Sequence, residues 1–421
     1  MANIAIVCPP LPGHLNPMFT LGRALVKRGH RAYVFTIPAL AANVRSQGLD
    51  FEAVGAVGGD ALAESIREMG GKRGLSSLRY AVGRARQLTQ LLCEELPERF
   101  RAAGIELALV DQNEPAGGSV AEYLGLPFVN VCPSLPLNRE PDIPPPFVPW
   151  TFRPGVWGRL RNRIGYGLSD WLIRPINGTL NRYRRGWGLR PISAPDDTFS
   201  RRAQLCQMAR ELDFPRRALP QSFHYLGPFC DAGGPGGGAA FPFERLNGKP
   251  LIYASLGTLQ ARDSRHFHTI AEACAGLEAQ LVIATGGEGG DLPQGLAGEP
   301  VVVRYAPQLD LLARASLTIT HAGLNTVMQS LLFGVPMVAL PITHDQPAIA
   351  ARMAHAGAGE TIPIGRATSA NLRAAVQRVM REPGYRTRAE SLRDSVKAAG
   401  GVERAAAIVE DVLRNTMPRR A

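Results

Sequence analysis

Two stretches of alternating strand and helix patterns, separated by a glycine-rich segment, constrain the fold of this chain more than any other feature. In the first stretch, an apolar run at 4–8 leads through a proline-rich turn into a helical pattern over 18–28, and a second strand pattern follows at 32–36. In the second stretch, a strand at 251–255 precedes a helical pattern over 267–277 and a further strand. Because strand, helix and strand in succession form the unit of a parallel sheet, each stretch predicts a doubly wound, Rossmann-like α/β domain.

The segment between the two stretches sets the predicted domain limits. It contains the run Gly233-Gly234-Pro235-Gly236-Gly237-Gly238, which is typical of a linker and cannot form a packed element. The prediction is a first domain at 1–228, a linker at 229–250, a second domain at 251–400 and a C-terminal helix at 401–421. Ligands of such sheets bind outside the carboxyl ends of the strands, so the two domains are expected to face each other across a cleft.

Composition disfavours several classes of protein. No apolar run approaches the roughly 20 residues that a membrane-spanning helix needs. The first residues lack the basic region of a signal peptide and have the pattern of a strand. The six cysteines are scattered with no CxxC pair, which disfavours a disulfide scaffold or a zinc site and favours a cytoplasmic location.

The segment 150–190 is strongly basic and rich in tryptophan. It contains nine arginines against one acid, Asp170, together with all four tryptophans of the chain. Arginine interleaved with tryptophan is typical of a helix at a membrane surface, so peripheral contact with an anionic membrane is one interpretation. The alternative is a solvated helical pair whose tryptophans face the core. No known nucleic-acid-binding fold accompanies the charge, and no nucleic-acid partner is expected.

The stretch 305–346 carries the largest group of residues suited to binding a ligand. Around His321 a buried strand stops and a helix begins, so unpaired backbone N–H groups and the helix dipole favour a phosphate there. Asn325 and Thr326 add side-chain donors in the first helical turn, and His321 can donate to a phosphate oxygen. The alternative is that Asn325 or Thr326 only caps the helix and that His321 is a turn residue.

This stretch, together with the run Gly13-His14-Leu15-Asn16-Pro17, resembles the signature of the family 1 glycosyltransferases, the UDP-glycosyltransferases of GT-B fold. The resemblance covers the whole chain. It implies an acceptor-binding first domain, a UDP-sugar-binding second domain and C-terminal helices that cross back to the first. Within the family the chain looks most like bacterial carotenoid glucosyltransferases of the zeaxanthin type, in the runs 253–260, 321–326, 345–352 and 399–401.

The resemblance implies a role for each residue on the donor side. At the uracil it implies stacking by Tyr305 with Gln308 beside it. It implies that the diphosphate is bound by His321, Gly323, Asn325 and Thr326, with Ser255 and Thr258 in the facing loop. It implies that the hexose hydroxyls are bound by Asp345 and Gln346. Gln329 departs from the family, because most members carry a glutamate there that holds the ribose hydroxyls. A neutral amide lacks the charge that about doubles the strength of such a hydrogen bond.

The resemblance also implies a catalytic pair. His14 is the candidate general base, because a neutral imidazole with a pKa of about 6.5 suits the removal of a proton from a hydroxyl. Asp111, at the end of a predicted strand, matches the aspartate that holds this histidine in the family and would stabilise its charged form. The alternatives are a turn histidine and an aspartate that caps a strand end.

The sequence therefore predicts an inverting, metal-independent glycosyltransferase that moves a hexose, expected to be glucose, from a UDP-sugar to a hydroxyl of a lipophilic acceptor such as a carotenoid. No Asp-x-Asp pair is present to bridge a metal to the diphosphate, so no metal and no cofactor beyond the UDP-sugar co-substrate are expected. The alternatives are an O-glycosyltransferase for polyketides, macrolides, phenolics or flavonoids, a sugar-nucleotide epimerase, and a non-catalytic UDP-sugar binder. The expected state is a monomer or weak dimer in the cytoplasm, peripheral to the inner face of the cell membrane.

Overall fold

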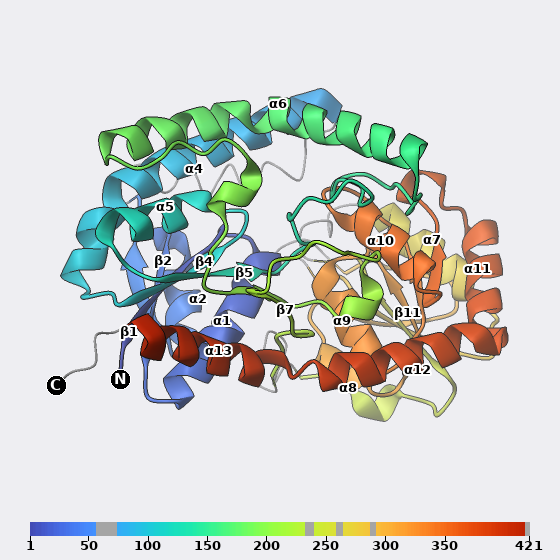
Figure 1. Ribbon diagram of the computed structural model, residues 1–421. Helices are drawn as coiled ribbons and strands as arrows, with labels where there is room; N and C mark the ends of the chain where they lie inside the picture. The colour runs from blue at the N-terminus through green and yellow to red at the C-terminus, as the bar shows by residue number, and fades with distance from the viewer. Residues whose placement is uncertain (56–73, 232–239, 258–263, 287–291, 417–421) are drawn as a thin grey trace.

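Buried apolar runs form the strands of two separate sheets (Figure 1). The structure is a computed structural model that describes residues 1–55, 74–231, 240–257, 264–286 and 292–416, with the backbone alone at 74–79. The strand order is β3-β2-β1-β4-β5-β6-β7 in the first sheet and β10-β9-β8-β11-β12-β13 in the second. Neighbouring strands run parallel throughout both sheets. The two predicted Rossmann-like α/β domains are therefore confirmed.

The strands are short, as buried parallel strands are. Those of the first sheet are β1 (Asn3–Val7), β2 (Arg31–Thr36), β3 (Asp50–Ala53), β4 (Leu107–Asp111), β5 (Phe128–Cys132), β6 (Gln204–Cys206) and β7 (Phe223–Tyr225). Those of the second sheet are β8 (Leu251–Ser255), β9 (Gln280–Ala284), β10 (Val301–Val303), β11 (Ala315–Thr320), β12 (Met337–Ala339) and β13 (Gly359–Thr361).

Helices cover both sheets (Figure 1). In the first domain they are α1 (Pro12–Lys27), α2 (Ala41–Ser46), α4 (Gly74–Ala102), α5 (Pro115–Leu124) and α6 (Val156–Gly186). After β8 they are α7 (Ser264–Cys274), α8 (Gln308–Leu312), α9 (Leu324–Leu332), α10 (Gln346–His355), α11 (Ser369–Arg381), α12 (Pro383–Ala398) and α13 (Gly401–Thr416).

Each sheet reverses its strand order beside its first strand. β1 lies between β2 and β4, and β8 lies between β9 and β11. At such a point the loops that leave neighbouring strands diverge, which favours ligand binding at their carboxyl ends. His14 follows β1 and Asp111 ends β4, while Ser255 ends β8 and His321 follows β11. The candidate residues therefore gather at the switch points of the two sheets.

The first helix begins earlier than the sequence predicts. The prolines suggest a turn before residue 18, but α1 starts at Pro12, so His14 lies in its first turn and not in a loop. Proline is well tolerated in a first helical turn, because its missing N–H would have no helical partner there. Pro17 lies inside the helix, where its missing N–H does leave a carbonyl without a partner.

The last two helices link the domains. α12 packs on α9 of the second domain and α13 packs on α1 of the first. Gly400 and Gly401 lie between them with φ values of +91° and +56°, which glycine adopts without strain. Val409 and Leu413 of α13 join the apolar core under the first sheet.

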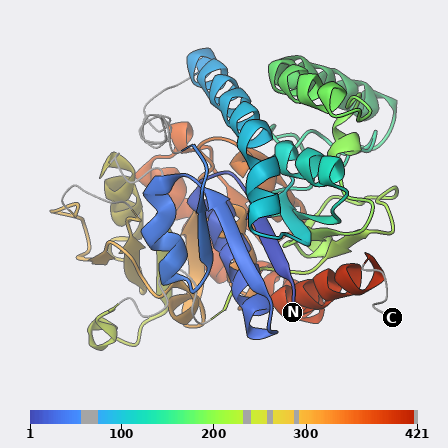
Figure 2. The same cartoon turned by 90° about the vertical axis from the view of Figure 1, so that its left-hand side faces the viewer.

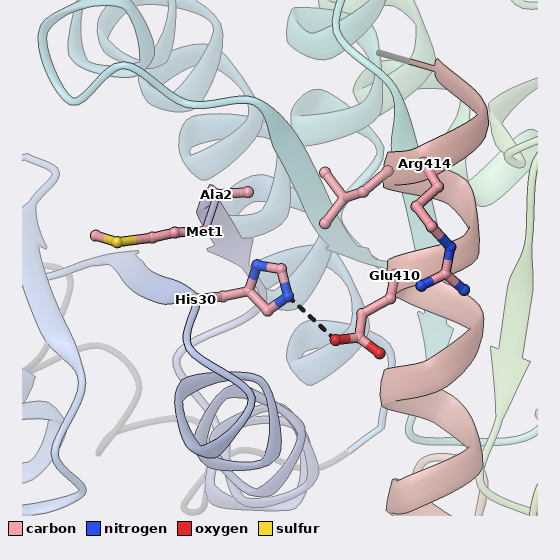
Figure 3. A pocket seen from close by; sticks show the side chains of 6 residues that line it. Met1, Ala2, His30, Glu410 and Arg414 are labelled. Carbon is pink, nitrogen blue, oxygen red and sulfur yellow. Dashed lines mark hydrogen bonds and ion pairs between the residues drawn. The ribbon is translucent and has the colours of Figure 1, made fainter. Parts of the chain in front are cut away.

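A surface hollow lies where α13 meets the start of the chain (Figure 3). The residues that line it are Met1, Ala2, His30, Glu410, Leu413 and Arg414. His30 Nε2 is 3.4 Å from Oε1 of Glu410, which ties α13 to the first domain. Because His30 follows the last turn of α1 and His14 lies in its first turn, this hollow is at the far end of the helix from the candidate base.

The two domains share a buried apolar interface. Leu135 and Met208 of the first domain belong to the same cluster of buried side chains as Leu324 and Met328 of the second. The contact therefore holds α9, which begins at the candidate phosphate site, against the first domain.

A buried charge cluster crosses the same interface. Asp213 of the first domain accepts hydrogen bonds from Nε of Arg216 at 2.6 Å and from Nε of Arg352, in α10, at 2.7 Å. Tyr225 donates to the same carboxylate at 2.8 Å, and the Arg352 guanidinium lies 4.4 Å from the ring centre of Phe214. Burial alone would raise the pKa of Asp213, but the two guanidinium groups hold it well below its usual range.

The basic segment forms one long helix, α6, and not the helical pair considered from the sequence. Trp157 and Trp171 are 82% and 64% exposed, whereas Trp187 stacks on Tyr123 at 4.8 Å. The interpretation in which the tryptophans face the core is therefore wrong for Trp157 and Trp171. Figures 1 and 2 show α6 beside α4 at the outer edge of the first domain. Among the described helices, none combines the length and apolar character needed to cross a membrane.

Part of the predicted linker, residues 232–239, lies outside the described residues. Beyond it, Phe241 belongs to the same buried cluster as Leu251 and Tyr253 of β8, and its ring meets that of Phe243 edge-on at 4.9 Å. The chain thus joins the core of the second domain before β8 begins.

Candidate active site

His14 and Asp111 form a hydrogen-bonded pair at the carboxyl edge of the first sheet. His14 Nδ1 is 2.7 Å from Oδ2 of Asp111, whose side chain is fully buried. With Nδ1–H donating to the carboxylate, Nε2 is the ring nitrogen left to accept a proton. The pair has the geometry that a general base and its orienting carboxylate require.

Two residues that the sequence did not single out surround Asp111. Asn113 donates to Oδ1 of Asp111 from its backbone N at 2.8 Å and from Nδ2 at 3.2 Å, which fixes the carboxylate. Burial and the charge of Asp111 raise the pKa of Glu114 to about 8, so Glu114 is neutral at neutral pH and adds no second charge there. A polar run directly after a buried strand, at 111–114, was the signal for both.

Charges from both domains act on His14. Burial lowers the pKa of His14, but the charge and hydrogen bond of Asp111, together with the charge of Asp345, outweigh it and raise the pKa above its ordinary value. Asp345 immediately precedes α10 of the second domain. The candidate base of one domain and a candidate sugar-binding residue of the other are therefore close enough to influence each other's protonation.

This arrangement predicts the pH dependence of kcat/KM. A base must be neutral to accept a proton, so activity should fall as pH drops through the raised pKa of His14, with a midpoint above about 6.5. Asp111→Asn removes the charge that raises this pKa, so the midpoint should move to lower pH. Initial rates across pH 5 to about 9 test this, and an acid limb that is unchanged in Asp111→Asn would contradict it.

The turn between β11 and α9 is shaped for an anion. Ala322 has a φ of +66°, in the left-handed region. Gly323 is the residue before the helix, and it has no side chain that could cap the first turn. The first N–H groups of α9 are thus available to a ligand, and the helix dipole favours a negative one. Thr326 lies in the same turn and is 7% exposed.

His321 fits between two glycines. A Cβ at Gly257, whose φ is +78°, would lie 2.8 Å from the imidazole ring, and one at Gly323 would lie 2.5 Å from Nε2. Burial lowers the pKa of His321 to about 4, although a hydrogen bond from the ring to the backbone of Ser255 acts in the opposite direction. No described residue forms a hydrogen bond with the buried Nδ1. His321 is therefore neutral at neutral pH and can offer a phosphate a hydrogen bond but no charge.

Asn325 reaches across to the first domain. Its Nδ2 donates to the carbonyl of Gly13 at 3.1 Å, and its Oδ1 accepts from Nε2 of Gln207 at 2.6 Å. In a regular helix the N–H of residue 17 would bond to the Gly13 carbonyl, but that residue is Pro17 and has no N–H. The carbonyl is therefore available to Asn325, which ties the turn that carries His14 to the start of α9. Nothing in the sequence pointed to Gln207.

The residues expected at the uridine lie around α8. Tyr305 precedes α8 and is 44% exposed, so its ring has a surface on which a base could stack. Gln308, the first residue of α8, accepts from Tyr253 Oη at 3.1 Å and donates through Nε2 to Oε1 of Gln329 in α9. The two glutamines expected at adjacent parts of the nucleoside are thus bonded to each other.

Gln329→Glu is expected to tighten UDP-sugar binding by about 1 kcal/mol, roughly fivefold in Kd. The glutamate keeps an acceptor for Gln308 and offers the ribose hydroxyls a charged one. Calorimetric titration with UDP-glucose measures the effect, with Gln329→Ala as the control expected to weaken binding. Equal or weaker binding by Gln329→Glu would show that the site has adapted to the amide.

The residues expected at the hexose lie at the start of α10. Gln346 Oε1 accepts from the backbone N of Ile342 at 2.9 Å and of Thr343 at 3.0 Å, so its amide NH2 remains for a sugar hydroxyl. Burial raises the pKa of Asp345, against the opposing charges of His14 and His344. Thr258, expected in the loop that faces the diphosphate, lies outside the described residues.

All six cysteines are free thiols, and all except Cys230 are buried. In the part of the chain that the structure describes, no three His, Cys, Asp or Glu side chains gather as a metal site would require.

Two doubly wound domains with a shared buried interface, and C-terminal helices that return to the first domain, define the GT-B fold. The same fold occurs in the glycotransferase of kitacinnamycin, with a TM-score of 0.73 and 24% identity over 98% of this chain and 99% of that one. CalG4, the calicheamicin glycosyltransferase, gives a TM-score of 0.73 at 20% identity over 99% and 100% of the two chains. The UDP-glucoronosyl and UDP-glucosyl transferase family model matches residues 75–414, and the chain belongs to this family.

Two relatives resemble the chain over nearly its full length. The zeaxanthin glucosyltransferase of Pantoea ananas is 35% identical over 99% of this chain and 97% of its own. The zeaxanthin glucosyltransferase of Pseudescherichia vulneris is 33% identical over 98% of each. The predicted family is therefore confirmed, and the protein is a glycosyltransferase.

Proposed function

We propose that this enzyme moves glucose from a UDP-sugar to a hydroxyl of a lipophilic acceptor such as a carotenoid, with inversion at the anomeric carbon. The observation that carries the proposal is the His14–Asp111 pair, whose base also responds to the charge of Asp345 in the other domain. A base on one domain that faces sugar-binding residues on the other is what attack on an anomeric carbon requires. The similarity to two zeaxanthin glucosyltransferases supports glucose as the sugar and a carotenoid as the acceptor.

In the proposed reaction, Nε2 of His14 takes the proton of the acceptor hydroxyl while the oxygen attacks the anomeric carbon. The bond from that carbon to the UDP oxygen breaks, and its electron pair leaves with UDP. Attack opposite the leaving group converts an α-linked donor into a β-glycoside. Asp111 stabilises the imidazolium. The first N–H groups of α9 and the neutral His321 donate hydrogen bonds that stabilise the negative charge developing on UDP.

Mass spectrometry of reactions between several UDP-sugars and a panel of alcohols tests the substrate assignment. UDP-glucose with a carotenoid diol should give products heavier by one and two hexoses. Transfer only to phenolics or macrolides would contradict the carotenoid acceptor. Conversion of the UDP-sugar without an acceptor would instead indicate an epimerase, and binding without any conversion would indicate a non-catalytic binder.

Activity is expected to survive removal of divalent ions. In the proposed mechanism the leaving UDP is met by the first turn of α9 and His321, and the sequence has no Asp-x-Asp pair to carry a metal. Initial rates after dialysis against EDTA should match those of untreated enzyme. Complete loss that Mg²⁺ or Mn²⁺ restores would contradict this mechanism.

We further propose a cytoplasmic enzyme that works at the inner face of the cell membrane, as a monomer or weak dimer, with no cofactor beyond its UDP-sugar co-substrate. A strongly apolar acceptor resides in the bilayer, because transfer of its surface into water is unfavourable. An enzyme that uses such an acceptor must therefore meet it at the membrane.

A further inference from the structure

One face of α6 exposes a row of large apolar side chains. Six of the eleven exposed large apolar side chains in the described part of the chain belong to this helix. They are Val156 (78% exposed), Trp157 (82%), Leu160 (47%), Ile164 (64%), Leu168 (59%) and Trp171 (64%). Beyond the adjacent first pair, their spacing of three or four residues puts them on one side of the helix, which we call the α6 face. A contiguous row of this kind marks an interaction surface, unlike single exposed apolar residues.

The opposite side of α6 is anchored to the protein. Asn162 is buried and donates through Nδ2 to the carbonyl of Pro141 at 3.0 Å. Tyr166 donates through Oη to the carbonyl of Ile143 at 3.1 Å, and Gly165 is buried in the same side of the helix. These contacts fix the rotation of the helix, so the α6 face points away from the protein.

The charges around the α6 face are almost all positive. Exposed arginines that precede the helix or lie along it are Arg153, Arg163, Arg174, Arg182 and Arg185. Asp170, the one acid in the α6 sequence, pairs with Arg139. Arg159 pairs with Asp142 at 2.8 Å, and is therefore not counted among the charges open to a partner.

We propose that the α6 face docks on an anionic lipid surface. Indole rings suit the headgroup boundary, aliphatic side chains suit the acyl region beneath it, and arginines match anionic headgroups. A second copy of the chain is a poorer match, because two such faces would bring arginines of like charge together. The occupant that fits both the apolar row and its charge is a bilayer that contains acidic lipid.

Docking in this way would bring the domain interface close to the membrane. Ile143 and Phe152, in the loop beneath α6, pack in one apolar cluster with Phe214 and with Ala351 of α10. The helix that rests on lipid is thus connected through this loop to the element that begins at the candidate hexose site. The proposal that the α6 face docks on lipid depends only on the exposed side chains and charges described above. Its purpose, delivery of an acceptor from the bilayer, rests on the proposed function.

Intrinsic fluorescence gives a direct test, because every tryptophan of the chain lies at 150–187. The full chain is mixed with vesicles of phosphatidylcholine alone or with added phosphatidylglycerol, and lipids brominated in the acyl chain are used as quenchers. We expect co-sedimentation with the phosphatidylglycerol vesicles, quenching by the brominated lipid, and release at 1 M salt, where screening acts within about 3 Å. Failure to sediment with phosphatidylglycerol vesicles at low salt would overturn the proposal.

Matched variants separate the α6 face from general charge. Arg163→Ser with Arg174→Ser should weaken binding about 25-fold, since each arginine near an anionic surface contributes about a factor of five. Arg366→Ser with Arg381→Ser removes the same charge from exposed positions of the second domain and should change binding little. Equal losses in the two double variants would overturn the proposal.

The apolar row needs its own variants. Trp157→Ser with Trp171→Ser should weaken binding and abolish quenching, whereas Trp187→Phe, which replaces a stacked ring, should leave both intact. Analytical ultracentrifugation tests the alternative occupant. If the unsubstituted chain forms dimers and the double variant Trp157→Ser with Trp171→Ser does not, the α6 face binds a second copy of the chain instead of lipid. Docking variants should turn over a detergent-dispersed acceptor normally. Vesicle binding without any glycosyl transfer would leave docking standing and refute the proposed function.

Discussion

Replacing His14 by alanine is expected to lower kcat by roughly 10²–10⁴, the usual contribution of a general base. Nε2 of His14 is the proton acceptor in the proposed reaction, and the alanine variant has no replacement for it. Binding of UDP should change little, because His14 lies on the first domain while the expected nucleotide contacts lie on the second. Single-turnover rates and calorimetric titration with UDP measure the two quantities separately.

Asp111→Asn is the matched variant for this test, because it keeps the shape of the buried side chain but removes its charge. It should also reduce kcat strongly, because Asn113 donates to Oδ1, so the new amide NH2 would face Nδ1 of His14 and leave the ring proton on Nε2. Near-normal turnover by correctly folded His14→Ala would remove His14 from the mechanism.

Replacing Asp213 by alanine is expected to destabilise the protein by about 3–5 kcal/mol, because it leaves the guanidinium groups of Arg216 and Arg352 buried without their carboxylate. The side chains of Asp213 and Arg352 are 0% and 1% exposed, so water cannot replace the lost partner. Urea unfolding followed by circular dichroism measures the loss. Tryptophan fluorescence in the same samples reports on the first domain, since all four tryptophans lie in it.

Arg352→Met provides the comparison. It removes one guanidinium and leaves Asp213 bonded to Arg216 and Tyr225, so it should destabilise the protein less than Asp213→Ala. Methionine also retains apolar contact with the neighbouring Phe214 ring. A loss as large as that of Asp213→Ala would mean that the contact between domains, and not the unpaired charge, dominates the energetics.

The sheets were predictable because buried parallel strands are nearly continuous apolar runs. The run at 251–255 coincides with β8, and the run at 4–8 differs from β1 by one residue at each end. Helices with little apolar surface were harder to find. α12 buries only Ala389, Leu392 and Val396 and is otherwise polar, so its position depends on packing against α9 more than on its own pattern.

The start of α1 was missed because prolines usually mark a turn. Here Pro12 occupies the first helical turn, where proline is tolerated, and the helix continues through Pro17. Pro17 leaves the Gly13 carbonyl without its helical hydrogen bond, and Asn325 of the other domain donates to that carbonyl instead. A local pattern could not predict this, because the compensating contact comes from a residue 312 positions away.

The residues of the candidate site also fall into those that the sequence could predict and those that it could not. Motif residues such as His14, Asp111 and His321 could be named because their types and positions after strands suit the chemistry. Gln207, which donates to Asn325, could not be named, because it matters only through a contact between the domains. Long-range pairing of this kind leaves no trace in the spacing of residues along one chain.

The anomeric configuration of the product tests whether the transfer proceeds with inversion. UDP-glucose, in which the glucose is α-linked, is incubated with the enzyme and a carotenoid diol, and the glucoside is examined by proton NMR. We expect release of one UDP for each glucose transferred and a β-linked product, as a single displacement assisted by His14 requires. An α-linked product, or consumption of UDP-glucose with no glucoside formed, would contradict it.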